Sequence, residues 1–403
     1  MSDPTLRVAL FSGNYNYVTD GAAIALNHLV AHLERQGVEC LVFSPTVDPP
    51  AFEPSGTVVS VPSVPLPGRS EYRVALGLPR GVRRQLEAFR PTLFHLSAPD
   101  LLGYAARRLA LKWDVPAVAS FHTRYDTYFR YYHAAWIERY VTRYLRHFYR
   151  YCEHVYVPSE STAQVLREQH MARDVRIWSR GVDDSLFYPG RRDMAWRRSL
   201  GISDDEVVVA FVGRLVLEKG IDAFAATVQG LQGRGIRHRV LVVGAGPEHD
   251  NFAARLPRDA VFTGYLHGEA LARAYASADI FLNPSVTETF GIVTLESMAS
   301  GLPSVCADAT GSQSLVGDGA TGFLVRPGDG AAYVDAVARL IAEPVLRARM
   351  GGEAHRRSRH YTWDAVMDEL LVCYHEVLEA HRHLKGASPH GAERRAVRDP
   401  ALT

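Results

Sequence analysis

The chain has 403 residues, of which 47% are hydrophobic and 22% are charged, and its formal net charge is +1. This balance excludes an intrinsically disordered chain, which would have fewer apolar residues and a larger net charge, and it gives no overall reason to expect nucleic acid as a partner. The length predicts two domains of ordinary size.

Neither a membrane span nor an export signal is expected. No apolar run approaches the ~20 residues of a spanning helix, and the apolar stretch 6–11 is too short for a secretory signal. The four cysteines are scattered without CxxC or CxxH spacing. This scatter predicts neither a zinc site nor a disulfide framework, so we expect a protein of the reducing cytoplasm.

The first half of the chain alternates short apolar strands with helices. Residues 6–11 are predicted to form a buried strand, residues 22–36 an amphipathic helix, and residues 38–43 a second strand. Further strands are predicted at residues 57–61, 93–96, 116–121, 154–157 and 175–178. Strands separated by helices predict a parallel sheet that is covered on both faces.

The second half repeats this alternation. The turn-rich, charged stretch 181–205 interrupts the pattern and is the best candidate for an interdomain connection. Further strands are predicted at residues 207–212, 239–243, 261–263, 280–283, 304–307 and 323–325. The sequence therefore predicts an α/β protein with two doubly wound domains. Their predicted extents are 1–182 and 183–361, with a helix at about 362–384 that packs back on the first domain and a mobile tail at 386–403.

The loop after the first strand, SGNYNYVTDG, leads to a helix start. It lacks GxGxxG spacing, so it gives no support for a nicotinamide or flavin cofactor. Free N–H groups at a helix start can receive a phosphate, and Gly21 would let that phosphate approach the backbone. An N-cap by Thr19 or Asp20, with Gly21 only as a turn residue, is an equally good interpretation.

The loop after the first strand of the second domain, VGRLVLEKG, carries two cations between glycines. Arg214 is suited to bidentate contact and Lys219 to acting as a point charge, so together they can neutralise a diphosphate. The alternative is a solvated Arg214 beside a surface pair of Glu218 and Lys219. Taken by itself, this loop favours the alternative.

The stretch 283–303, NPSVTETFGIVTLESMASGLP, is the strongest signal in the chain. Glu288 lies in a loop and Glu296 follows eight residues later, on a helix that starts near Gly291, so both can face one crevice. Carboxylates accept hydrogen bonds from vicinal hydroxyls, and the N–H groups of residues 290–293 can receive phosphate oxygens. The alternative is a solvated pair of acids that the helix dipole favours.

Taken together, these motifs resemble the retaining glycosyltransferases of family 4. The loop ETFGIVTLE resembles their E-x7-E signature, and VGRLVLEKG, VVGAGP, YASADIFLNPS and GFLV stand in the expected places along nearly the whole chain. The ordered set is far more specific than any single motif. The resemblance implies the GT-B architecture, two facing Rossmann-like domains with a cleft between them, and transfer of a hexose from a nucleotide diphosphate sugar.

The resemblance also implies roles for the E-x7-E residues. The first Glu of the motif binds hydroxyls of the donor sugar, and this role falls on Glu288. The backbone N–H groups of Phe290, Gly291 and Ile292 lie beside it. The second Glu binds the nucleotide ribose, and this role falls on Glu296.

The remaining donor contacts come from other loops. Arg214 and Lys219 match the cations on the diphosphate, and Gly21 matches a backbone contact from the first domain. His122, in the run Ser-Phe-His-Thr after a strand, matches the active-site histidine near the donor sugar; without the family it could equally be a core histidine. The base is expected to meet backbone groups near Leu266.

The chemistry that the resemblance implies needs no metal and no cofactor. Helix ends, Arg214 and Lys219 would stabilise the departing diphosphate electrostatically. The chain has no paired-aspartate metal motif placed after a strand. Retention is usually pictured as attack on the same face with the leaving phosphate as base, so His122 would orient the sugar and not act as a nucleophile.

The acceptor should meet the first domain, where residues 125–151 interleave aromatic residues with arginines. Trp136, Tyr140, Tyr144 and Phe148 recur at helical spacing, which suits a membrane interface with anionic lipid heads. Relatives with a similar HTx(Y/F)xxYxRYY stretch include mannosyl and sulfoquinovosyl transferases that glycosylate membrane lipids. The alternative is that these aromatic residues belong to the core. Stacking on single-stranded nucleic acid would need a more basic chain.

We therefore expect a cytoplasmic hexosyltransferase that is peripheral on the inner face of the plasma membrane. Its expected partners are a nucleotide-sugar donor, a lipid or glycan acceptor and anionic membrane, with no nucleic acid. A soluble transferase for a polysaccharide or small glycoside, and a non-catalytic nucleotide-sugar binding protein, are the alternatives. The motifs do not separate guanine from uracil donors.

Overall fold

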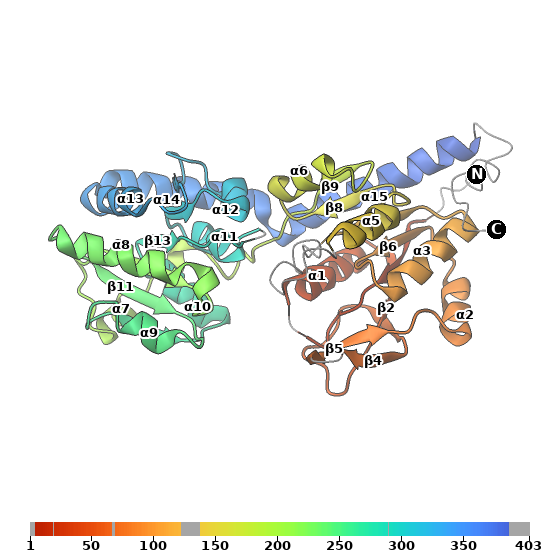
Figure 1. Ribbon diagram of the computed structural model, residues 1–403, viewed down its shortest axis with the longest axis horizontal. Helices are drawn as coiled ribbons and strands as arrows, with labels where there is room; N and C mark the ends of the chain where they lie inside the picture. The colour runs from red at the N-terminus through yellow and green to blue at the C-terminus, as the bar shows by residue number, and fades with distance from the viewer. Residues whose placement is uncertain (1–4, 19, 67–68, 122–137, 289, 387–403) are drawn as a thin grey trace. The chain divides into compact units, whose positions relative to one another are not determined.

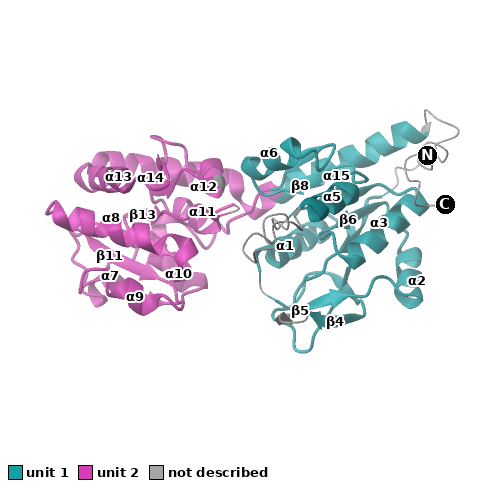
Figure 2. Cartoon of the chain, in the orientation of Figure 1, with its two compact units in different colours: residues 1–178, 367–403 teal, residues 179–366 magenta. Residues whose placement is uncertain are grey.

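The computed structural model describes residues 5–18, 20–66, 69–121, 138–288 and 290–386. The chain divides into two compact units (Figure 2). Unit 1 comprises residues 1–178 and 367–403, and unit 2 comprises residues 179–366. The stretch 181–205, expected to connect the domains, is part of unit 2.

Unit 1 is built on a seven-stranded parallel sheet in the order β3-β2-β1-β6-β7-β8-β9 (Figure 1). A separate antiparallel pair, β4 and β5, lies outside this sheet. The strands are β1 (Arg7–Phe11), β2 (Glu39–Ser44), β3 (Thr57–Ser60), β4 (Ser63–Leu66), β5 (Arg69–Ala75), β6 (Leu93–Leu96), β7 (Ala117–Ser120), β8 (Val155–Val157) and β9 (Val175–Ile177). The helices are α1 (Gly21–Arg35), α2 (Arg80–Phe89), α3 (Leu101–Trp113), α5 (Glu138–Tyr149), α6 (Glu160–Glu168) and α15 (Trp363–Gly386), which starts in unit 2.

Unit 2 is built on a six-stranded parallel sheet in the order β12-β11-β10-β13-β14-β15. The strands are β10 (Val208–Val212), β11 (Arg239–Val243), β12 (Val261–Gly264), β13 (Ile280–Asn283), β14 (Ser304–Ala307) and β15 (Gly322–Val325). The α-helices are α7 (Met194–Ser199), α8 (Ile221–Gly233), α9 (His249–Ala253), α10 (Gly268–Ala276), α11 (Ile292–Ala299), α12 (Thr310–Leu315), α13 (Gly330–Ala342) and α14 (Pro344–Ser358). Short 3₁₀ turns are η3 (Pro189–Arg191), η4 (Leu217–Lys219) and η5 (Arg359–Tyr361).

The two sheets confirm the predicted α/β class with doubly wound domains. Every predicted strand is present, with ends within one residue of the prediction. The pattern works because central strands such as β6, β7 and β13 are buried along their whole length and are mostly apolar in sequence. The β4–β5 pair was not predicted, since its residues include prolines and show no clean alternation.

Aromatic side chains fill the core of each unit. In unit 1, Phe11 stacks on Phe43 at 5.0 Å and on Phe94 at 5.3 Å between ring centroids. In unit 2, Phe211 and Phe224 meet edge to face at 5.4 Å. Helices cover both faces of these sheets, so polar chemistry is confined to the loops at the strand ends. None of the described helices combines the length and the apolar character that a membrane span requires.

Candidate functional site

The sheet of unit 2 changes direction between β10 and β13. These strands are neighbours, but β10 leads towards β11 and β13 leads towards β14. In open α/β sheets, ligands bind outside the carboxyl ends of the strands at such a switch point. The two loops that open there are 213–220 and 284–291, the loops that carry the predicted site residues of this domain.

These two loops are held against each other. The hydroxyls of Ser285 and Thr287 both donate to the carbonyl oxygen of Glu218, at 3.4 and 3.1 Å. Gly220 adopts a left-handed φ of 74°, and a Cβ there would lie 2.9 Å from the carbonyl carbon and oxygen of Pro284. Only glycine permits both the conformation and the approach, so the two loops form one support.

An ion pair joins the loops at their tips. Lys219 Nζ lies 2.6 Å from Glu288 Oε1, and the two side chains are 29% and 14% exposed. Lys219 therefore pairs with Glu288 across the switch point and not with its neighbour Glu218, as the alternative interpretation held. Partial burial reduces the screening of this pair by water.

Arg214 follows β10 and Leu266 follows β12, at the same end of the parallel sheet. Arg214 is exposed, and its side chain makes no hydrogen bond or ion pair within the described part of the chain. Its cation is thus available to a ligand. Leu266 follows β12 and is partly buried, beside Tyr265, which is 75% exposed.

The second carboxylate of the motif lies on α11. The Tyr275 hydroxyl, on α10, donates to Glu296 Oε2 at 3.1 Å. Burial raises the pKa of Glu296 to about 7, although the Tyr275 hydroxyl acts in the opposite direction. The interpretation of the two acids as a solvated surface pair is therefore wrong, because Glu296 is partly buried and Glu288 is ion-paired. Near neutral pH Glu296 is poised to ionise when a hydroxyl donates to it.

The start of α11 lies between the two carboxylates in sequence. Gly291 is its N-cap residue with a φ of 93°, and no described side chain caps this end. Gly311 lets the start of α12 pack on the same loop, because a Cβ there would lie 2.8 Å from the Glu288 carbonyl oxygen. The N–H groups of Ile292 and Val293 belong to the first turn, which in a helix lacks backbone acceptors. Phe290 is buried beneath the loop.

In unit 1, Gly21 is the first residue of α1. The Asp20 carboxylate caps the helix, accepting from the N–H groups of Ala22 and Ala23 at 3.0 and 2.8 Å, and Asn14 holds it at 2.8 Å. The structure thus has the N-cap that the alternative interpretation placed at this helix start. Gly21 itself is exposed, and a Cβ there would meet no atom within 4 Å. Neither packing nor conformation requires glycine at this position.

Several predicted residues of unit 1 lie outside the described residues. They are Thr19, His122 and Trp136. The end of the predicted aromatic segment is described: Tyr140 is 53% exposed, whereas Phe148 is fully buried. Phe148 therefore belongs to the core, as the alternative interpretation held, and does not continue an exposed aromatic row.

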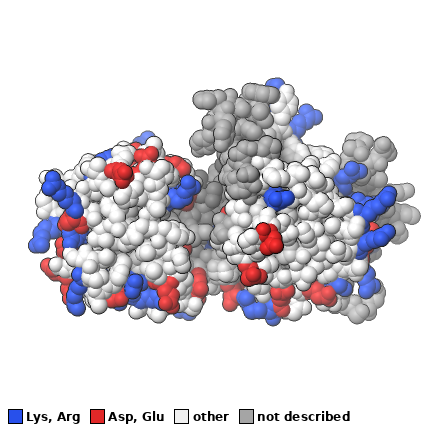
Figure 3. All heavy atoms as spheres, turned by 90° about the horizontal axis from the view of Figure 1, so that it is seen from below, with Lys and Arg blue, Asp and Glu red and all other residues white. Residues whose placement is uncertain are grey.

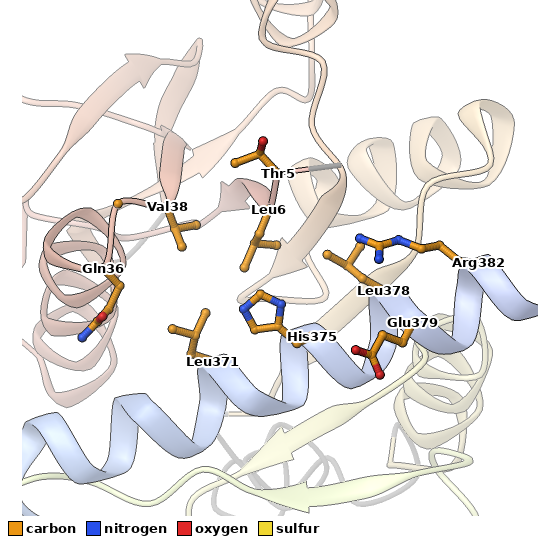
Figure 4. A pocket seen from close by; sticks show the side chains of 10 residues that line it. Thr5, Leu6, Gln36, Val38, Leu371, His375, Leu378, Glu379 and Arg382 are labelled. Atoms are coloured by element: carbon orange, nitrogen blue, oxygen red, sulfur yellow. The ribbon is translucent and has the colours of Figure 1, made fainter. Parts of the chain in front are cut away.

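A separate groove of about 410 Å³ lies in unit 1 beside α15 (Figure 4). Leu6 and Val38, which precede β1 and β2, line it together with Leu371 and His375 from α15. It opens at the amino ends of the strands, opposite the edge where ligands of such sheets bind. We do not include it in the candidate site.

The structure thus brings Lys219 and Glu288 together within unit 2, on the two loops that also carry Arg214 and lead to the start of α11. Tyr275 and the supporting glycines 220 and 311 were missed by the sequence analysis. Tyr275 opens the YASADIFLNPS motif, but a tyrosine twenty-one residues before a glutamate gives no sign of a hydrogen bond. Among the described residues, no cluster of three His, Cys, Asp or Glu could hold a metal ion.

Comparison with known proteins identifies the family. Residues 19–186 match the family profile described as Glycosyltransferase Family 4, and residues 206–343 match that of Glycosyl transferases group 1. The chain is 36% identical to a GDP-mannose-dependent alpha-mannosyltransferase of Mycolicibacterium smegmatis, over 95% of this chain and 100% of the relative. It is 29% identical to the sulfoquinovosyl transferase SQD2 of Arabidopsis thaliana, over 90% of this chain and 72% of that protein.

The fold is shared with a solved structure. Sucrose-phosphate synthase from Thermosynechococcus elongatus superposes with a TM-score of 0.73 at 22% identity, covering 93% of this chain and 100% of that structure. This likeness supports the architecture, and the sequence relatives support the activity class. The chain therefore belongs to the group 1 glycosyltransferases and has their GT-B fold.

Proposed function

We propose that the protein is a retaining hexosyltransferase that takes its sugar from a nucleotide diphosphate donor and passes it to a membrane lipid at the cytoplasmic face. GDP-mannose is the donor to test first, because a relative that matches 95% of this chain is named for its use. The observation that carries the proposal is the Lys219–Glu288 pair at the switch point of unit 2.

The diphosphate is proposed to bind between Arg214, Lys219 and the start of α11. The exposed guanidinium of Arg214 can contact two phosphate oxygens at once, and the first-turn N–H groups of α11 supply further donors. Negative charge grows on the diphosphate as its bond to the sugar breaks. Fixed cations and N–H groups stabilise that charge without rearranging, which lowers the barrier.

The two carboxylates are proposed to hold the two sugars of the donor. Glu288 accepts hydrogen bonds from hydroxyls of the transferred hexose, and Glu296 accepts them from the ribose of the nucleotide. An arriving diphosphate competes for Lys219 and so frees an oxygen of Glu288 for the hexose. Backbone groups near Leu266 are proposed to meet the base, and Gly21 to approach the donor from unit 1.

Retention is proposed from the chemistry of the relatives' reaction. GDP-mannose carries its mannose in the α configuration, so an enzyme named as an alpha-mannosyltransferase keeps that configuration. In the proposed mechanism the acceptor attacks the face that the diphosphate leaves, and a phosphate oxygen takes the acceptor's proton. His122 is proposed to orient the hexose, and no metal ion or cofactor takes part.

The acceptor is proposed to be a lipid, met by unit 1 at an anionic membrane surface. The relative SQD2 is named for a sulfoquinovosyl transfer, so the sugar varies among the relatives. A soluble transferase for a polysaccharide or small glycoside would use the same donor site with a different acceptor. A non-catalytic binding protein would bind the donor without turnover.

A panel of nucleotide sugars tests the proposal. The purified protein is incubated with GDP-mannose, UDP-glucose and other donors, with and without vesicles made from a bacterial lipid extract, and release of the nucleotide is measured. We expect GDP release from GDP-mannose that accelerates with lipid, and an α-linked product by NMR. Release that accelerates only with a soluble glycan favours the soluble transferase. Binding without any release would contradict an enzyme.

A further inference from the structure

The β4–β5 hairpin of unit 1 exposes apolar side chains that the core does not use. Val64 and Leu66 of β4 are 45% and 37% exposed, and Leu76, directly after β5, is 57% exposed. The two strands pair only with each other among the described strands. Exposed apolar side chains that are grouped in this way mark an interaction surface.

Positive charge accompanies this apolar group. Residues 57–89, from β3 to the end of α2, contain five arginines and two acidic residues, whereas the whole chain has 45 basic and 44 acidic residues. Figure 3 views the molecule from the side of the hairpin. The face of unit 1 in that view is largely white, with Lys and Arg towards its right-hand end and Asp and Glu near its middle and lower edge.

The arginines of α2 form no ion pairs with carboxylates in the described part of the chain. Arg80, Arg83 and Arg84 are exposed, and across the described ranges of the chain their side chains make no hydrogen bond or ion pair. Other exposed arginines have such partners; Arg198 lies 2.6 Å from Asp204, for example. Apolar side chains beside unpaired cations are complementary to an anionic lipid surface, where the cations meet head groups and the apolar groups enter the interface.

The hairpin is also fixed to the loop that leads to Gly21. Arg73 of β5 donates its N–H to the Tyr17 hydroxyl at 3.2 Å, and that hydroxyl donates to the Gly13 carbonyl oxygen at 2.6 Å. The Arg73 guanidinium donates to Ser63 Oγ of β4 at 2.7 Å and so links the two strands of the hairpin. A surface that binds the hairpin therefore lies beside the loop from which the proposed donor contact of unit 1 comes.

We infer that the β4–β5 hairpin and the exposed arginines of α2 dock unit 1 on an anionic lipid bilayer, and that the acceptor lipid reaches the enzyme along this hairpin. This inference rests on the proposed function for its acceptor. It differs from attachment through residues 125–151, whose described helix α5 places Phe148 in the core and bonds Arg146 to the Gln169 carbonyl oxygen.

Vesicle co-sedimentation tests the docking surface. The full chain is mixed at low salt with vesicles of phosphatidylcholine alone or with phosphatidylglycerol added. We expect binding only to the anionic vesicles, weakened by salt, and reduced at least ~10-fold by Arg83→Glu with Arg84→Glu and by Val64→Ser with Leu66→Ser. The charge-matched control is Arg326→Glu with Arg349→Glu in unit 2, which should bind as the wild type does.

A fluorescent reporter separates insertion from simple adhesion. Leu66→Trp should shift its emission to the blue on anionic vesicles and be quenched by brominated lipid. Val345→Trp, at a position of unit 2 that is 82% exposed, should do neither. A Leu66→Trp emission that vesicles leave unchanged would overturn the inference.

Turnover separates failure of this inference from failure of the proposed function. The hairpin variants should keep wild-type hydrolysis of the donor in the absence of lipid while losing transfer to vesicle-borne acceptor. Wild-type binding by the hairpin variants, with loss only in Arg139→Glu and Arg143→Glu, would assign the surface to α5 and refute our inference. A change in oligomeric state of the lipid-free hairpin variants would assign the surface to a second copy of the chain, which also refutes it. Absence of hydrolysis in every protein, with vesicle binding as expected, would refute the proposed function alone.

Discussion

At the scale of single residues, the two glutamates of the motif have different surroundings, and these predict different behaviour. Glu288 is held by the Lys219 ammonium. Glu296 is partly buried, with one hydroxyl donating to it and a pKa raised to about 7. The charge of Glu288 is thus already neutralised by Lys219, whereas ionised Glu296 needs a ligand to stabilise its charge.

Nucleotide binding should depend on pH through Glu296. Its pKa in the unliganded protein lies above the ordinary value of 4.5, and ribose hydroxyls donate only to an acceptor, so they favour the ionised form. The affinity for GDP should therefore rise with pH up to about 7, by at most ~10-fold per unit, and then level off. Calorimetric titrations from pH 5.5 to 8.5 check this. The Glu296→Gln variant is the control, since its affinity should be lower at pH 8 and should keep only the pH dependence that the terminal phosphate of GDP contributes.

The two glutamates should also separate in kinetics. Glu296→Ala should weaken nucleotide binding and raise KM, because the ribose is held in every state. Glu288→Ala should mainly lower kcat, because the hexose changes during the reaction. Steady-state kinetics with GDP-mannose measure both parameters. Equal and small effects of the two variants would contradict the assignment.

Lys219 should contribute to the rate more than to folding. Lys219→Ala removes the cation proposed to stabilise the departing diphosphate, so transfer should slow by ~10²–10³-fold, the usual loss when one such group is removed. Lys219→Arg should recover part of the rate, since the charge is kept. Full activity in Lys219→Ala would refute the role. Loss of wild-type activity in EDTA, restored by a divalent metal, would contradict the metal-free chemistry.

At the scale of elements, the site depends on how closely two loops approach at the switch point. The turn η4 and the loop after β13 touch through Gly220, whose φ of 74° and contact with Pro284 exclude a side chain. The hydroxyls of Ser285 and Thr287 complete the junction. The packing of these two loops therefore fixes the distance between Lys219 and Glu288.

Gly220→Ala should destabilise the protein by roughly 1–3 kcal/mol, because the backbone is strained and the Cβ meets the Pro284 carbonyl. Gly233→Ala, at the other end of α8, is the matched control: its Cβ would meet nothing within 4 Å, so its stability should be unchanged or up to ~1 kcal/mol higher. Urea denaturation measures both. Equal stabilities of the two variants would show that the junction tolerates a shift.

At the scale of the whole molecule, the proposed donor contacts come from both units. The chain passes from one unit to the other after residue 178 and again within α15. Two connections between the units allow a hinge motion and restrict its direction. A donor that contacts Gly21 as well as unit 2, as proposed, links the two units while it is bound.

Donor binding should therefore compact the protein. Small-angle X-ray scattering with and without saturating GDP-mannose should show a smaller radius of gyration in the bound state. GDP alone is the useful comparison, since it lacks the hexose that Glu288 is proposed to hold. Scattering curves that coincide in all three states would argue against closure.

The sequence by itself determined the fold class and the residues to examine. Strands buried on both faces are mostly apolar, so short apolar runs located the strands of both sheets and the loops that follow them. The E-x7-E motif located Glu288 and Glu296, since its letters and order are specific. The family followed from the order of the motifs.

Only the tertiary structure decided which of these residues interact. Lys219 and Glu288 are 69 residues apart, and no local pattern encodes a pair formed by two loops that follow strands distant in sequence. The raised pKa of Glu296 depends on burial among residues distant in sequence, and Tyr275 becomes its partner only when α10 packs beside α11. The sequence also did not predict that the β4–β5 hairpin of unit 1 is exposed, because exposure depends on which surfaces the rest of the chain covers. Local sequence specifies secondary structure through short-range geometry, whereas contacts and electrostatic environments arise from long-range packing.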